Sequence, residues 1–170
     1  MTETVERLLA EMHIARRLSD RPAREAATGV TTADLWAEAR REAGAPASLA
    51  VARALRDRQD VARRYRRMLE GLALAHAPVA LAASDGDVRR RIGDAELRLL
   101  TQDGGALLVI ENAGAARALD IMAEDGETLR LALPQEDGGA MILSLGADTP
   151  DGARAHALLR DPGTALFLLP

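Results

Sequence analysis

The chain has 170 residues, 48% of them hydrophobic and 28% charged, which is enough apolar material for a core and argues against global disorder. It contains no cysteine, so disulfides and thiolate zinc sites are excluded. One Trp, one Tyr and one Phe leave its core to aliphatic side chains. The length fits one large domain or two small ones. The net charge is −4.

The charge is unevenly distributed, and all 22 basic residues are Arg. Residues 1–80 carry 14 Arg and 11 acidic residues, a net charge of +3, whereas residues 81–170 carry 8 Arg and 15 acidic residues, a net charge of −7. Because cationic side chains dominate phosphate binding, this balance argues against nucleic acid as a partner of the second half. It leaves an acidic protein as a possible partner of the first half.

The sequence predicts neither a secretory signal nor a membrane span. The opening residues, MTETVERLLAEMH, place acidic side chains where a secretory signal requires a basic start. The longest apolar stretch, Leu72 to Ala83, is about twelve residues long, whereas a membrane span needs about twenty. We therefore expect a cytoplasmic protein without a membrane span.

Two amphipathic helices are predicted before residue 45. Apolar residues at i, i+3, i+4 and i+7 spacing predict the first over 4–18. The second is expected to begin at Thr31 or Thr32, where Asp34 can return a capping hydrogen bond, and to end at Gly44. The apolar faces of the two helices include Leu8, Met12, Leu35 and Trp36.

A third, longer helix is predicted over about residues 47–75, with a dense row of charges opposite its apolar stripe. Acidic and basic residues four positions apart could pair locally, so one interpretation is a solvated face with internal ion pairs. The second is a docking face, because Arg is enriched at interface hot spots and binds carboxylates through two parallel bonds. Nucleic acid is a third, weakened by the intervening acids and by the lack of aromatic residues that could stack on bases.

From residue 95 the apolar pattern changes to period two, which is typical of half-buried strands. The run 107–110 is apolar on both sides and predicts a strand covered on two faces. Asp-Gly pairs, among them Asp125-Gly126 and Asp151-Gly152, punctuate the runs at hairpin spacing. The predicted fold class is α+β: a helical unit of three or four helices over 1–77, then an antiparallel β-sandwich or barrel-like module over 78–170.

No catalytic constellation can be recognised. The three His residues lack metal-ligand spacing, and no Ser lies in a nucleophile motif. The glycine pairs fit turns and do not match a phosphate-binding loop. The sequence therefore predicts a protein that is not an enzyme, with no metal ligands and no cofactor.

The segment Leu49 to Leu72, LAVARALRDRQDVARRYRRMLEGL, resembles the third and fourth helices of bacterial anti-sigma domains. In that family a helical N-terminal unit holds a sigma factor and a β-rich domain often follows. Because cysteine is absent and the stretch Leu72–Ala83 is too short for a membrane span, the resemblance implies a zinc-free, soluble variant. It implies that acidic residues of a sigma factor would be contacted by Arg56, Arg63, Arg64 and Arg67. Apolar contacts to the same partner would come from Leu8, Met12, Leu35 and Trp36.

The leading hypothesis is a non-catalytic, cytoplasmic regulatory or adaptor protein that binds another protein through its Arg-rich helical half. The first alternative is a small-molecule-binding or enzymatic β-barrel protein. Its candidate ligand-binding residues are Glu111, Asn112, Arg130 and His156. The second alternative is a structural accessory subunit of a larger complex. The sequence leaves the oligomeric state open.

Overall fold

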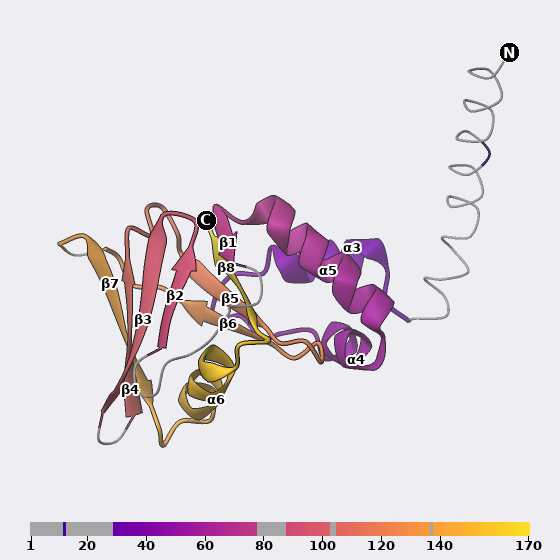
Figure 1. The fold of residues 1–170 in the computed structure, drawn as a ribbon. Coiled ribbons are helices and arrows are strands. Elements are labelled where there is room, and N and C mark those ends of the chain that lie inside the picture. The colour runs from indigo at the N-terminus through magenta and orange to yellow at the C-terminus, as the bar shows by residue number, and fades with distance from the viewer. Residues whose placement is uncertain (1–11, 13–28, 78–87, 103–104, 137) are drawn as a thin grey trace, which may run out of the picture.

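A computed structural model of the chain describes residues 12, 29–77, 88–102, 105–136 and 138–170. Within them the fold is α+β, with four helices and two four-stranded antiparallel sheets (Figure 1). The helices are α3 (Thr32–Ala39), α4 (Leu49–Asp57), α5 (Gln59–Leu72) and α6 (Pro150–Arg160). The strands are β1 (Ala75–Ala77), β2 (Val88–Ile92), β3 (Ala95–Gln102), β4 (Gly105–Glu111), β5 (Ala118–Met122), β6 (Thr128–Ala132), β7 (Ala140–Gly146) and β8 (Ala165–Leu169).

The described residues form three layers (Figure 1). One sheet, in the order β2-β3-β4-β7, lies outermost and is termed the outer sheet. The other, in the order β1-β8-β5-β6, lies between the outer sheet and α3–α5 and is termed the inner sheet. One apolar core fills the space between the sheets, and a second lies between the inner sheet and the helices. The β part is therefore two facing sheets and not a closed barrel.

Strands β5 and β8 are the ones covered on both faces, and every residue of each is buried. Along β5, Leu119 and Ile121 point into the core between the sheets, whereas Ala118 and Met122 point towards the helices. The prediction of two-sided burial for 107–110 is wrong, because Leu107 and Val109 of β4 remain half-exposed. Two-sided burial follows from the position of β5 and β8 in the middle of the inner sheet.

The predicted long helix over 47–75 is in fact two helices. Arg58 adopts an extended conformation, with φ −136° and ψ 101°, and separates α4 from α5. The break lets each helix present its own stripe to the second core, with Leu55 from α4 and Tyr65 and Leu69 from α5. The prediction failed because apolar residues continue at helical spacing on both sides of Arg58.

The sequence pattern does not predict helix α6, because Asp151-Gly152 fits a hairpin turn. The pair instead lies in the first helical turn, where the Thr149 side chain accepts a hydrogen bond from the Gly152 N–H at 3.1 Å and Pro150 is the first helical residue. Its buried residues Ala155, Leu158 and Leu159 belong to the core between the sheets. Helices are therefore not confined to the N-terminal half of the chain.

Of the other predictions, one lies almost entirely outside the described residues and two are confirmed. The helix over 4–18 lies outside the described residues except for Met12, which is helical. The capping box predicted at Thr31 is confirmed: the Asp34 carboxylate accepts from the Thr31 N–H at 2.7 Å, and the Thr31 hydroxyl accepts from the Asp34 N–H at 3.2 Å. The Asp125-Gly126 turn is also confirmed, joining β5 to β6.

Tyr65, the sole tyrosine, is 2% exposed in the second core, which leads to a pH prediction. Burial raises the pKa of its hydroxyl above the ordinary value of 10.0, and the nearby Asp120 carboxylate acts in the same direction. The folded state therefore keeps a proton that the unfolded state releases, so the free energy of unfolding should be insensitive to this group below pH 10 and decrease above it. Tyrosinate ultraviolet absorbance should appear only together with unfolding, as followed by circular dichroism.

The variant Tyr65→Phe serves as the control for this titration. It should lose the part of the alkaline destabilisation that comes from the hydroxyl while keeping the ring in the core. A tyrosinate signal that rises near pH 10 while the protein stays folded would contradict the burial of Tyr65.

Candidate functional site

The largest concentration of charge in the described residues lies on α4 and α5. Residues 49–72 contain seven Arg and three acidic residues, which gives 7 − 3 = +4. The apolar stripe of α5 faces the inner sheet, with Val61, Tyr65 and Leu69 buried. The Arg side chains are therefore displaced towards solvent and towards the flanks of the helix. We term the exposed surface of α4 and α5 the Arg face.

Three of the four Arg residues expected to contact a partner are exposed: Arg56 on α4, and Arg63 and Arg67 on α5. The Nε of Arg67 donates to the backbone carbonyl of Arg63 at 3.3 Å, which directs the Arg67 side chain back along the preceding turn of the helix. Arg64 is half-buried on the flank facing α3, where its Nη2 donates to the Thr32 hydroxyl at 2.7 Å. Arg64 therefore contributes to the packing of α5 against α3.

The break at Arg58 changes which charges pair on this face. Asp60, four residues from Arg56, instead accepts two hydrogen bonds from Arg58, from Nε at 3.1 Å and from Nη2 at 3.3 Å. The Arg58 guanidinium holds the pKa of the Asp60 carboxyl below its usual value. Asp60 thus pairs with Arg58, and Arg56 is exposed.

A shallow cavity of about 210 Å³ adjoins the Arg face where α5 passes the end of β5. Arg63 and Arg66 line one side of it, and Met122 and Glu124 at the end of β5 line the other. The cavity gives the Arg face a depression of the size of a side chain. Because the Glu124 carboxylate lies at its rim, a ligand that brought several negative charges to that point would be repelled.

The apolar residues expected to contact a partner lie in different places. Leu35 is 1% exposed in the core between helices and sheet, so its side chain supports the fold in this state. Trp36 is half-buried on α3, with the Arg40 guanidinium over its ring at 5.1 Å from the centroid. Met12 is 61% exposed. Leu8 lies outside the described residues.

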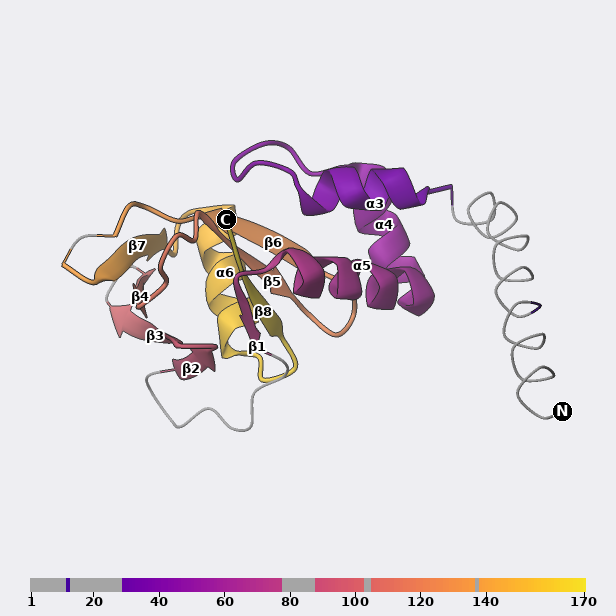
Figure 2. The ribbon, with the colours of Figure 1, turned by 90° about the horizontal axis from the view of Figure 1, so that it is seen from above.

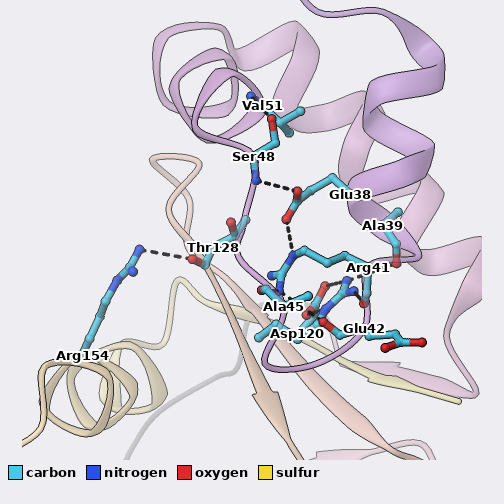
Figure 3. A network of polar contacts seen from close by, with 11 residues as sticks. Glu38, Ala39, Arg41, Glu42, Ala45, Ser48, Val51, Asp120, Thr128 and Arg154 are labelled. Atoms are coloured by element: carbon cyan, nitrogen blue, oxygen red, sulfur yellow. Dashed lines mark hydrogen bonds and ion pairs between the residues drawn. The ribbon is translucent and has the colours of Figure 1, made fainter.

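A buried ion pair joins the inner sheet to the end of α3, and Figure 3 labels its Asp120 beside Arg41 of the loop that follows α3. Asp120 of β5 and Arg130 of β6 lie directly opposite each other in the inner sheet, and the guanidinium donates from Nε and Nη2 to the two carboxylate oxygens, each at 2.5 Å. Arg130 also donates to the backbone carbonyls of Ala39, at 3.1 Å, and Arg41. Burial raises the pKa of the Asp120 carboxyl, although Arg130 and Arg41 oppose that shift. This pair fixes the end of α3 to the sheet.

A second pair continues the network towards α4 (Figure 3). The Glu38 carboxylate accepts from Arg41 Nε at 2.8 Å and from the Ser48 N–H at 2.9 Å. The Ser48 hydroxyl in turn caps α4 by accepting from the Val51 N–H at 3.4 Å. The loop between α3 and α4 is therefore held by side chains at both ends. This orders the start of α4 and with it the position of Arg56.

The four residues predicted for a ligand site do not converge. Arg130 is part of the buried network described above. Glu111 ends β4 and pairs with Arg98, and Asn112 follows it at the same end of the strand. His156 on α6 lines a cavity of about 350 Å³ with Gly105, which begins β4 at the opposite end. These residues provide no common place for a ligand, and the space between the sheets is filled by apolar side chains.

Two further findings concern the described residues only. They contain no group of three or more His, Cys, Asp or Glu side chains placed to hold a metal ion. None of their helices is long and apolar enough to cross a membrane. Comparison with known proteins found no matching family model, no matching curated protein and no matching solved structure.

Proposed function

We propose that the chain is a non-catalytic regulatory or adaptor protein whose Arg face binds an acidic surface of another protein. The observation that carries the proposal is the exposure of Arg56, Arg63 and Arg67 on two helices whose other faces are fixed to the inner sheet. Guanidinium groups form parallel hydrogen bonds with carboxylates, and such planar contacts are more specific than contacts from Lys.

The polar network under the Arg face supports this proposal because it limits the ordering cost of binding. Arg130 bonds to the end of α3, and Glu38 bonds to the residue that caps α4, so the backbone carrying the Arg side chains is fixed before a partner arrives. Pre-ordered surfaces lose less conformational entropy on association than flexible ones. What remains to be immobilised is the Arg side chains themselves.

An acidic protein fits the Arg face better than nucleic acid does. The three acidic residues among the seven Arg of this segment would repel phosphates. The aromatic side chains that could stack on bases are engaged elsewhere, since Tyr65 is buried and Trp36 carries Arg40 over its ring. The resemblance to anti-sigma domains would make the acidic partner a sigma factor.

Charge reversal on the Arg face should abolish partner binding without unfolding the protein. Partners are captured from the native host and identified by mass spectrometry, and the affinity of the enriched protein is then measured by titration calorimetry. Arg63→Glu with Arg67→Glu should weaken binding by about thirtyfold or more, which corresponds to about 2 kcal/mol, the contribution typical of one central interface Arg. Raising the salt concentration should weaken wild-type binding in the same direction.

Arg89→Glu with Arg91→Glu is the matched control. Both residues are exposed on β2 of the outer sheet, so the control makes the same change in net charge on a different layer of the molecule. It should leave the affinity nearly unchanged. Equal losses for the two double variants would show that only net charge matters, and capture of no enriched partner would count against the whole proposal.

A further inference from the structure

Strand β7 is an unprotected sheet edge. In the outer sheet β7 pairs only with β4, so its other side has no neighbouring strand among the described residues. Its seven residues, AMILSLG, include no charged residue and no Pro. Natural proteins usually shield a long edge strand with charges, Pro or a bulge, because it can otherwise pair with another chain.

The other three edges in the described sheets are each shielded. Strand β1 has only three residues. Strand β2 carries Arg89, Arg90 and Arg91 in succession. Strand β6 is five residues long, and its Arg130 ties it to the loop after α3. The lack of such a device therefore distinguishes β7 from every other edge of the two sheets.

The ladder geometry shows which backbone groups β7 presents. Its register with β4 pairs Glu111 with Ala140, and the ladder continues with the Asn112 N–H donating to the Gly139 carbonyl at 3.4 Å. Bonded and non-bonded pairs alternate along an antiparallel ladder. Every second residue, beginning with Ala140, therefore directs its N–H and carbonyl away from β4. Gly146 belongs to this series, but its carbonyl already accepts from Thr149. The residues that present both groups to a new strand are therefore Ala140, Ile142 and Ser144.

The side chains beside this edge form an apolar patch on the solvent face of the outer sheet. Ile142 is 60% exposed and lies opposite Val109, which is half-exposed. Leu107 and Leu100, half-exposed and opposite each other, occupy the next row of the same face. The patch reaches the β7 edge and ends there. Another strand laid along β7 would therefore have to cover or extend an apolar surface.

We propose that β7 pairs with the β7 strand of a second copy of this chain, forming a two-fold symmetric dimer with one continuous eight-stranded outer sheet. With Leu143 on the two-fold axis, Ile142 of each copy lies opposite Ser144 of the other, and their outward N–H and carbonyl groups meet. An identical strand brings no charge to this uncharged edge. It also joins the two apolar patches across the axis. Figures 1 and 2 place β7 at the end of the molecule away from α3–α5, so both Arg faces stay open.

The test uses the full chain and sedimentation velocity. The mass derived from sedimentation of the wild-type protein should be about twice the chain mass of 18.1 kDa, and it should decrease on dilution as the dimer dissociates. Ser144→Pro should raise the dimer dissociation constant by about thirtyfold or more. The ring removes an N–H that points away from β4, so the bonds between β7 and β4 remain. Ser144→Ala, which keeps that N–H, should remain dimeric.

A second variant and a local readout keep the test decisive if Ser144→Pro does not fold. Ile142→Arg with Ser144→Arg places four like charges around the two-fold axis and mimics the charges of β2, and it too should be monomeric with an unchanged circular dichroism spectrum. Amide hydrogen exchange at Ile142 and Ser144 should slow as wild-type concentration rises. The proposal would be overturned if the wild-type protein stayed monomeric at every concentration up to the solubility limit. Slow exchange of the β7 amides only when a different protein is bound would be such a case. A dimer that both variants leave intact would also overturn it.

Discussion

Arg130→Met is expected to lower the free energy of unfolding by about 3–5 kcal/mol, the usual cost of removing one partner of a buried ion pair. The Asp120 carboxylate would remain 5% exposed in the core between helices and sheet, without the two bonds that Arg130 supplies. The carbonyls of Ala39 and Arg41 would lose their donor at the same time. Urea unfolding followed by circular dichroism measures the loss.

The double variant Asp120→Leu with Arg130→Met separates the ion pair from the volume it fills. Removing both charges eliminates the uncompensated carboxylate, so the double variant should be more stable than Arg130→Met alone. It should still be less stable than wild type, because the two loop carbonyls stay without Arg130. A double variant no more stable than Arg130→Met, or a loss below about 1 kcal/mol for Arg130→Met, would show that the pair does not hold the loop.

The pH dependence of Arg130→Met has a defined sign. Burial already raises the pKa of Asp120, and without the opposing guanidinium the pKa in the folded variant rises further above its unfolded value. Protonation then favours the folded state. The variant should approach wild-type stability as the pH falls to about the unfolded value of 3.8, and lose stability as the pH rises through the folded pKa.

Trp36 provides a local reporter for the same variant. It is the sole Trp and lies on α3, whose last residue, Ala39, is bonded to Arg130. If the loop after α3 detaches before the sheets unfold, Trp36 fluorescence should change at a lower urea concentration than circular dichroism does. Coincident transitions would show instead that α3 and the inner sheet unfold as one unit.

This buried pair also shows what the sequence could and could not predict. Arg130 was predicted as a candidate ligand-binding residue, and Asp120 was not selected at all. The β5–β6 hairpin turns around Asp125, with the Ala123 N–H donating to the Glu127 carbonyl, and so places Asp120 opposite Arg130. Deducing the pair from the sequence requires both this register and the recognition of β5 as a strand. It was not recognised because burial on both faces removes the period-two pattern on which strand prediction depends.

Elsewhere the same physics separates success from failure. Strands β3, β6 and β7 were predicted because polar and apolar residues alternate along each of them, which leaves the period of two visible in the sequence. The break at Arg58 was missed because it depends on how α4 and α5 pack against the inner sheet. The helix after Thr149 was missed although its cap Thr149 and Pro150 are local signals, because Asp151-Gly152 fits a hairpin turn equally well. The exposed Arg residues needed only helical spacing, so the Arg face was predicted although the network beneath it was not.

Gly126→Ala is expected to destabilise the protein by about 3 kcal/mol, through a clash in addition to a strained backbone. Gly126 has φ +86°, in the region where residues with a Cβ are strained. A Cβ at this position would overlap the carbonyl oxygen of Leu55 and lie 2.5 Å from its carbonyl carbon and 3.0 Å from the Arg56 nitrogen. The β5–β6 turn thus packs directly on the backbone of α4, and neither side can yield by rotating a side chain.

Gly114→Ala is the matched control, because Gly114 also has a positive φ, +62°, but a Cβ there would meet nothing within 4 Å. It should cost about 1 kcal/mol, the price of the backbone conformation alone. The difference between the two variants in thermal or urea unfolding therefore measures the contact between the turn and α4. Since that contact adjoins Arg56, Gly126→Ala should also weaken partner binding at temperatures where the protein is still folded. Equal destabilisation by the two variants would mean that α4 can move away from the turn at no cost. The Arg face would then lack the rigid support on which its proposed role depends.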